Sequence, residues 1–356
     1  MPERPERTHV FIIDGTLSTL EDGQETNAGL LYKLLTENGP TARTTVGYDP
    51  GVQAQGLMKW VHIAAGSGIN LSILDGYAAL ASRYEPGDNL MLFGFSRGAY
   101  AARSLAGFIG RIGLLRRELA TERRIQRAFR LYEAAEVGDA ARAFTAKYCH
   151  DQAPINVLGV WDTVKALGLP YPLLNRLAPM ATEFHDHLLS PSTENAFHAI
   201  AIDENRTSYE CLPWKTDPGS TANVEQAWFP GAHGDIGGHI NTSYKSRTLS
   251  NIPLVWMLER AQSCGLELPD GWQEEFPCDP AAPMQGPYRR SARLFIDRKP
   301  RVVGNCSSEY MHESVRQRQQ NLPRYKPRAI INIRQTKSQS EPSEPIPEAQ
   351  PEPAMS

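Results

Sequence analysis

The sequence has few cysteines, no long apolar run and almost no excess of charge. Its five cysteines lie far apart among 356 residues without a C-x-x-C pair, which favours a reducing cytosol over a disulfide framework or a zinc site. No apolar stretch reaches the roughly 18 residues that a membrane span needs. Residues 1–7 are charged, unlike a signal peptide. We expect a cytoplasmic protein, and any export would use a route without a cleaved signal.

The net charge of −3 lacks the basic excess that is typical of general nucleic-acid-binding proteins. We therefore expect no nucleic-acid partner, and the residues give no reason to expect a metal ion or another cofactor. The length is sufficient for one large domain with a sizeable core.

Short apolar runs alternate with stretches of helical period, which predicts an α/β fold with a mostly parallel sheet and helices on both faces. The expected strands are Val10 to Ile13, Thr44 to Tyr48, Asn89 to Phe95, Ile155 to Trp161, Phe197 to Ile202 and Glu225 to Phe229. The expected helices are Gly29 to Leu35, Ser72 to Tyr84, Ala99 to Ile109, Glu118 to Ala135 and Pro253 to Cys264, the last with Ser250 and Asn251 as candidate caps.

Two insertions interrupt this alternation. Residues 116–150 are charged and helical in period, and they form either a cap over the site or an exposed helical pair, which is the favoured interpretation. Residues 165–191 hold prolines and large apolar side chains and are a candidate lining for a substrate groove. We expect the catalytic domain to span residues 8–332 and the Pro-, Glu- and Ser-rich residues 335–356 to form a disordered tail.

The most informative string is Gly94-Phe95-Ser96-Arg97-Gly98, which stands between an apolar run and a helix-like segment. This order is typical of the nucleophile elbow of an α/β-hydrolase. Glycines relieve crowding in the sharp turn, and the Ser96 hydroxyl is expected to be exposed on a strained tip. The following helix offers the Arg97 N–H as a donor to an oxyanion. A tight turn with an ordinary solvent-exposed serine is the alternative.

A serine nucleophile needs a base, and the base needs an orienting carboxylate. His233 stands in a glycine-dense loop after an expected strand, and we expect it to be the base; a histidine that caps a turn is the alternative. Asp162 and Asp203 each end an expected strand between Ser96 and His233, which is the chain order of this fold. The residues leave the acid open between these two, and either can instead cap a helix.

Asp14-Gly15-Thr16 closes the first expected strand. Phosphatases of the haloacid dehalogenase type carry D-x-D-G-T at this place, but Ile12 occupies the position of their nucleophile and cannot attack phosphorus. In a hydrolase, this loop lies at the same sheet edge as Ser96. The N–H groups of Gly15 and Thr16 then complete an oxyanion hole with that of Arg97.

Several strings, in order over residues 8–330, resemble the α/β-hydrolase family that includes the catalytic domains of type VI secretion phospholipase effectors. The strings are Asp14-Gly15-Thr16, Tyr48-Asp49-Pro50-Gly51-Val52, Tyr84-Glu85-Pro86-Gly87-Asp88, Gly94-Phe95-Ser96-Arg97-Gly98-Ala99-Tyr100, Gly159-Val160-Trp161-Asp162-Thr163-Val164, Ala201-Ile202-Asp203-Glu204, Trp228-Phe229-Pro230-Gly231-Ala232-His233, His312-Glu313-Ser314-Val315 and Tyr325-Lys326-Pro327. The chain departs from the family at Leu17-Ser18, where an aromatic residue and an asparagine are frequent, and after His233.

The resemblance implies a triad of Ser96, Asp162 and His233, with Asp162 chosen because the G-V-W-D-T-V string matches there. It implies hydrolysis of carboxylic esters, with phospholipids as the substrates of the known effectors. We expect a serine esterase or phospholipase that acts on a lipid or small-molecule ester, with peripheral membrane contact and the type VI export route both compatible with the family. A housekeeping esterase and a non-catalytic interaction domain of the same fold are the alternatives.

Overall fold

The computed structural model describes residues 4–16, 18–37, 43–51, 67–134, 137–164, 188–215, 219–239, 244–287 and 297–332. The predicted tail at 335–356 and residues 165–187 of the apolar insertion lie outside this part of the chain.

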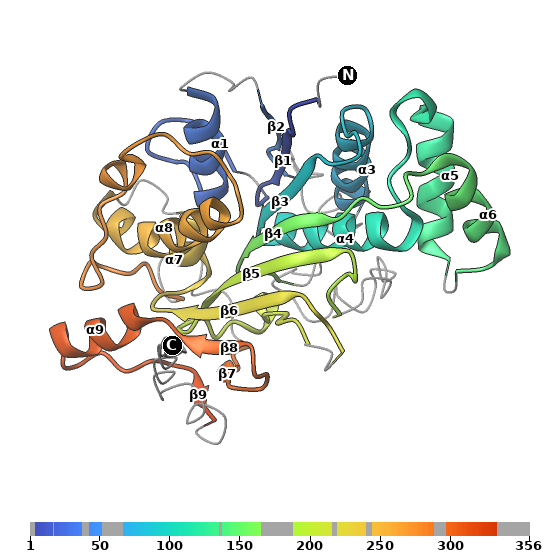
Figure 1. The fold of residues 1–356 in the computed structure, drawn as a ribbon. Coiled ribbons are helices and arrows are strands. Elements are labelled where there is room, and N and C mark those ends of the chain that lie inside the picture. The colour runs from blue at the N-terminus through green and yellow to red at the C-terminus, as the bar shows by residue number, and fades with distance from the viewer. Residues whose placement is uncertain are drawn as a thin grey trace, which may run out of the picture.

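A seven-stranded sheet in the order β2-β1-β3-β4-β5-β6-β8 forms the centre of the molecule, and neighbouring strands pair in parallel throughout (Figure 1). The strands are β1 (Thr8–Ile13), β2 (Thr44–Asp49), β3 (Asn89–Phe95), β4 (Ile155–Trp161), β5 (Thr193–Ala201), β6 (Asn223–Phe229) and β8 (Glu309–Met311). The parallel α/β fold predicted from the alternation is confirmed. A separate parallel pair joins β7 (Val302–Val303) to β9 (Ile330–Ile331).

Helices cover both faces of this sheet. One face carries α1 (Asn27–Glu37), α7 (His233–Gly237) and α8 (Arg247–Ser263). The other carries α3 (Ser67–Ala81) and α4 (Arg97–Ile112), with α5 (Glu122–Glu133) and α6 (Asp139–Tyr148) packed outside them, whereas α9 (Glu313–Asn321) lies near β6. Because both faces are covered, all four residues of the β3 run 90–93 are fully buried, which explains its continuous apolar character.

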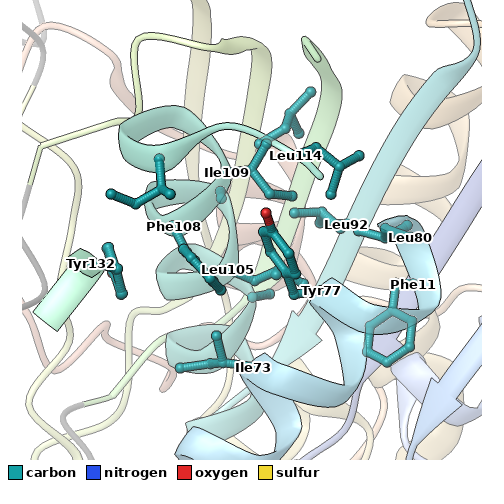
Figure 2. Packing of buried hydrophobic residues seen from close by; sticks show 14 of the residues in the cluster. Phe11, Ile73, Tyr77, Leu80, Leu92, Leu105, Phe108, Ile109, Leu114 and Tyr132 are labelled. Carbon is teal, nitrogen blue, oxygen red and sulfur yellow. The ribbon is translucent and has the colours of Figure 1, made fainter. Parts of the chain in front are cut away.

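The larger core cluster lies between α3, α4 and the sheet. Figure 2 shows Phe11 and Leu92 of the sheet beside Tyr77 of α3 and Phe108 of α4. The Tyr77 and Phe108 rings stack with centroids 4.1 Å apart, and the Tyr77 hydroxyl donates to the Gly113 carbonyl at 2.7 Å. The Tyr77 ring packs on an apolar partner and its hydroxyl has a hydrogen-bond acceptor. These two contacts hold α3 against α4.

The insertion at 116–150 forms the helical pair α5 and α6 rather than a cap over the site. Tyr132 of α5 stacks on Phe108, and the Thr145 hydroxyl of α6 donates to the Ile112 carbonyl at 2.7 Å. Both contacts lie toward the C-terminal end of α4, whereas Ser96 precedes its first residue. The structure thus agrees with the favoured interpretation of this segment, and the alternative of a cap over the site is wrong here.

Helix α8 begins at Arg247, six residues before the predicted start, so the prediction that Ser250 and Asn251 cap it is wrong. The Ser250 hydroxyl donates to the Ser246 carbonyl one turn back, and the Asn251 side chain bonds Arg247 and the Pro277 carbonyl. These contacts place both polar residues inside the helix, where Pro253 also lies. The elements after residue 300 are short and were not predicted.

Candidate active site

The carboxyl ends of β1, β3, β4, β5 and β6 meet at one edge of the sheet because these strands are parallel. The residues that follow them are Asp14, Ser96, Asp162, the pair Ile202-Asp203, and the loop that leads to His233. Every residue predicted for the site belongs to one of these junctions or to the first residues after it. The fold alone thus gathers them at one place.

Ser96 occupies a tight turn between β3 and α4. Its φ of 59° lies in the left-handed region, a conformation that costs about 1–3 kcal/mol for a residue with a Cβ. A Cβ on Gly94 would lie 2.5 Å from the Gly98 carbonyl oxygen, and one on Gly98 would lie 2.1 Å from that of Ile13. Glycine is therefore required on both sides of the serine. Ser96 is only 8% exposed, less than the exposed tip that the sequence suggested.

His233 stands between Ser96 and Asp162. Its Nε2 lies 2.9 Å from Ser96 Oγ, and its Nδ1 lies 2.6 Å from Asp162 Oδ2. The Phe95 and Tyr209 rings lie 4.9 and 4.7 Å from the imidazole centroid. The three predicted residues, which come from positions 66 and 71 residues apart in the chain, form a continuous hydrogen-bonded series, and both imidazole nitrogens are engaged in it.

Asp162 is fully buried and has a φ of 41°, which makes it a second strained residue at a strand end. Its Oδ1 accepts from the Ala201 N–H at 2.9 Å and from a guanidinium nitrogen of Arg301 at 2.5 Å; Oδ2 accepts from the other terminal nitrogen of Arg301 at 2.9 Å. Burial acts to raise the pKa of Asp162. The Arg301 charge and the hydrogen bonds from His233 and Arg301 outweigh it and hold the pKa well below its usual range.

Asp203, the alternative acid, has other partners. Its Oδ2 accepts from the Gly231 N–H at 2.8 Å and from the Tyr325 hydroxyl at 2.7 Å, and its Oδ1 accepts from the Arg328 N–H at 3.1 Å. Burial is the largest influence on this carboxyl and raises its pKa. Among the described residues Asp203 makes no hydrogen bond to His233, and it fixes the loop that precedes that residue.

Two further buried carboxylates hold the His233 loop. Glu204 accepts from the His233 N–H at 3.2 Å, and the Arg206 side chain donates to both of its oxygens. Asp235 accepts from the Ala232 N–H at 2.9 Å and from the Gln285 N–H at 2.8 Å. The backbone around His233 is therefore fixed by buried carboxyl acceptors, and Asp235 binds loop amides.

The predicted oxyanion donors differ in availability. Arg97 is the first residue of α4, so its N–H has no acceptor within the helix. The Gly15 N–H donates to Asp14 Oδ1 at 2.6 Å and is already engaged. The Thr16 hydroxyl is buried and has no partner among the described residues. Of the predicted donors, the Gly15 N–H is thus already engaged, whereas the Arg97 N–H has no acceptor within α4; the Thr16 hydroxyl was not part of the prediction, which named the Thr16 N–H.

Across the described ranges, no group of three or more histidine, cysteine, aspartate or glutamate side chains could hold a metal ion. Within the same part of the chain, no helix is long and apolar enough to cross a membrane.

Sequence reasoning missed Arg301, Glu204 and Tyr209 as neighbours of the triad. Glu204 lies in a string that we had quoted, so it was within reach of the pattern. Arg301 had no signal, because it stands in a short polar segment without periodicity and reaches Asp162 from a residue 139 positions away.

A family model described as the catalytic domain of the T6SS phospholipase effector Tle1-like proteins matches residues 7–260. An uncharacterized protein of Saccharomyces cerevisiae is 29% identical over 229 residues, which cover 57% of this chain and 32% of that protein. The chain thus spans about a third of the length of this relative.

Two solved structures are similar in part. A crystal structure of an uncharacterized protein from Pseudomonas aeruginosa has a TM-score of 0.40 and 15% identity, over 77% of this chain and 49% of that chain. The structure of the Tle1 effector bound to the VgrG spike of the type 6 secretion system has a TM-score of 0.40 and 18% identity, over 67% and 52%. The chain spans about half of each.

Proposed function

The chain belongs to the T6SS Tle1-like phospholipase effector catalytic domain family, and on this premise we propose that it hydrolyses carboxylic ester bonds of lipids or phospholipids with Ser96 as nucleophile. The observation that carries the proposal is the series Ser96 Oγ, His233 and Asp162 Oδ2, joined by contacts of 2.9 and 2.6 Å. A nucleophile, a base and an orienting carboxylate in this order are the requirements of acyl transfer.

In this mechanism Ser96 Oγ attacks the ester carbonyl while His233 Nε2 takes its proton. The imidazolium then gives that proton to the leaving alcohol, and a water molecule hydrolyses the acyl-enzyme by the same two steps. Asp162 keeps the proton of the neutral ring on Nδ1, so that Nε2 is an acceptor. We assign the oxyanion to the Arg97 N–H together with an N–H of the loop from Asp14 to Thr16.

The strain at Ser96 and Asp162 favours an enzyme over a non-catalytic interaction domain. Two residues with a Cβ at φ of 59° and 41° together cost the fold about 2–6 kcal/mol. A binding module gains nothing from this cost, whereas a hydrolase uses it to place the hydroxyl and the carboxylate.

A fluorophosphonate probe tests the proposal, because it labels a serine that is activated by a base. We expect labelling of the wild-type protein and none of Ser96→Ala. Ser82→Ala, which changes an exposed serine at the end of α3, is the matched control and should be labelled like the wild type. A folded wild-type protein whose Ser96 stays unlabelled would refute the proposal.

The substrate class is tested separately with purified protein. Phospholipid vesicles, triacylglycerol emulsions and short-chain soluble esters are compared, with Ser96→Ala as the blank for each. We expect release of fatty acid from phospholipid. Hydrolysis of the soluble esters alone would retain the serine mechanism and remove the phospholipid assignment.

A further inference from the structure

Arg301 contacts the triad carboxylate through both ends of its guanidinium. One terminal nitrogen lies 2.5 Å from Asp162 Oδ1 and the other lies 2.9 Å from Oδ2. The same two nitrogens donate to the carbonyls of Ala201 at 2.9 Å and Tyr209 at 2.7 Å. The side chain is 6% exposed. All four contacts fix the guanidinium plane, so the carboxylate that it holds cannot turn independently.

We propose that Arg301 is a positioning residue for the hydrolysis, which orients the Asp162 carboxylate toward His233 and balances its charge. This inference rests on the proposed function of the triad. It concerns a residue outside 7–260, the part of the chain that the family model matches. The segment after residue 260 thus contributes to the site, although it supplies none of the three triad residues.

The first consequence of the Arg301 contact is a fixed tautomer. Arginine only donates hydrogen bonds, so both oxygens of Asp162 remain acceptors. Oδ2 therefore accepts from His233 Nδ1–H, and the ring keeps a lone pair on Nε2 toward Ser96. A bidentate arginine supplies this constraint through geometry, whereas a lysine supplies charge without the planar fork.

The second consequence is electrostatic. The imidazolium formed during the reaction faces a carboxylate whose charge Arg301 already balances, so it holds its proton less tightly than it would beside a free carboxylate. Without Arg301, the buried carboxylate would also take up a proton more readily, because burial disfavours its charged form. Both effects act in the same direction: loss of Arg301 shifts the pH at which activity is lost upward.

Other titratable groups lie around the triad, and among them burial raises the pKa of Asp14, Asp203 and Asp235. Burial lowers the pKa of His198 to about 3 and raises that of the Cys211 thiol to about 12. The pKa of Glu204 is lowered, since the Arg206 guanidinium and its hydrogen bonds outweigh burial. Burial lowers the pKa of Arg97 and that of Arg103, the latter to about 10. Because Arg301→Met and Arg318→Met both leave these groups in place, a difference between the two pH profiles reports on the Arg301 contact.

Arg301→Met tests the inference, because methionine keeps an apolar stem and removes the fork and the charge. Arg318→Met is the matched control: Arg318 is also a buried arginine of the C-terminal segment, but it donates to the carbonyls of Pro280 and Ala282 and not to the triad. The rate of fluorophosphonate labelling is measured against pH for both. The pH at which the His233 ring takes up a proton is measured by nitrogen-15 NMR.

In the profile of labelling rate against pH, the acidic limb is the range in which the rate falls as the pH falls. We expect this limb to lie about one pH unit or more higher for Arg301→Met than for the wild type, and to coincide with the wild type for Arg318→Met. A folded Arg301→Met whose limb coincides with the wild type overturns the inference. If Arg301→Met does not fold, Arg301→Lys decides. Its labelling rate should fall about tenfold or more at the pH optimum, and a wild-type rate and limb overturn the inference.

The two readouts separate this inference from the proposed function. The NMR titration needs no turnover. An upward shift of the His233 titration in Arg301→Met, in a protein whose Ser96 is never labelled, supports the Arg301 contact and refutes the hydrolase. Labelling of Ser96 with no shift in either readout supports the hydrolase and overturns the role of Arg301.

Discussion

Replacement of Asp162 by asparagine has an outcome that follows from the donors around its two oxygens. Oδ1 faces the Ala201 N–H and an Arg301 nitrogen, both of which only donate. Oδ2 faces one obligate donor, the other Arg301 nitrogen, and His233 Nδ1, which can accept. The amide therefore keeps its carbonyl oxygen at the Oδ1 position and places its NH₂ group toward His233 Nδ1, at the loss of that Arg301 contact. The ring then accepts at Nδ1 and carries its proton on Nε2, which cannot remove the Ser96 proton.

The wrong tautomer cost about 10⁴ in rate in a known protease triad. A factor of this size corresponds to about 5 kcal/mol of transition-state stabilisation. Arg301 also loses its buried counter-charge, and breaking a buried ion pair from one side costs about 3–5 kcal/mol of stability. Asp162→Asn should therefore be almost inactive and clearly destabilised.

Asp203→Asn is the matched comparison, since it changes a buried carboxylate at the end of the adjacent strand. Its Oδ2 contacts, to the Gly231 N–H and the Tyr325 hydroxyl, can both be kept by an amide oxygen. Only the contact with the Arg328 N–H is lost, a cost of about 1–3 kcal/mol in stability. We expect this variant to keep activity within about tenfold of the wild type.

Initial rates of ester hydrolysis and second-order rates of fluorophosphonate labelling measure the activity, and urea unfolding measures the stability. An inactive Asp203→Asn beside a nearly normal Asp162→Asn would refute the assignment and move the acid to the next strand. The roles of Ser96 and His233 would survive that result.

Ser96→Gly should be inactive like Ser96→Ala but more stable than it by about 1 kcal/mol or more, because glycine adopts a φ of 59° without strain; equal melting temperatures in calorimetry would contradict this. Since the pKa of buried His198 is about 3, the unfolded chain binds a proton below about pH 6.5 that the folded chain does not, so stability falls as the pH falls from 6.5 toward 3. His198→Gln should reduce that fall by up to about 1.4 kcal/mol per pH unit in urea titrations, and an unchanged pH dependence would count against it. Gly237→Ala should lower the stability by about 1–3 kcal/mol and slow hydrolysis, because its Cβ would lie 1.9 Å from the Phe95 ring that packs on His233. A wild-type rate and melting temperature would contradict this, because they would mean that the Phe95 ring moves aside without cost.

The sheet and the serine turn were predictable because their signals are local. The bounds of β3 and β4 agree with the prediction at both ends, since each is an apolar run between turn residues. A Cβ on Gly94 or Gly98 would clash with backbone atoms, so the two glycines in the string indicate the tight turn directly. The steric demand of such a turn is met by residues within five positions, and sequence alone displays it.

The rest depended on contacts that are distant in sequence. Asp162 and Asp203 look alike as strand ends, and only the partners from residues 301, 325 and 328 distinguish them. The sequence offered the Gly15 N–H as an oxyanion donor, but in the structure this group donates to the Asp14 side chain. The start of α8 carries no side-chain cap hydrogen bond, so no local signal marked it. No local pattern reports which of several donors a buried carboxylate will meet.

The residues that hold both strand-end carboxylates come late in the chain. A ribosome makes Ser96, Asp162 and His233 well before it makes Arg301, and makes Tyr325 later still. A nascent chain thus holds the three proposed triad residues while Arg301, which we propose to orient Asp162, is still unmade. Under the proposed function, the chain can hydrolyse esters at the full rate only after synthesis has passed Arg301.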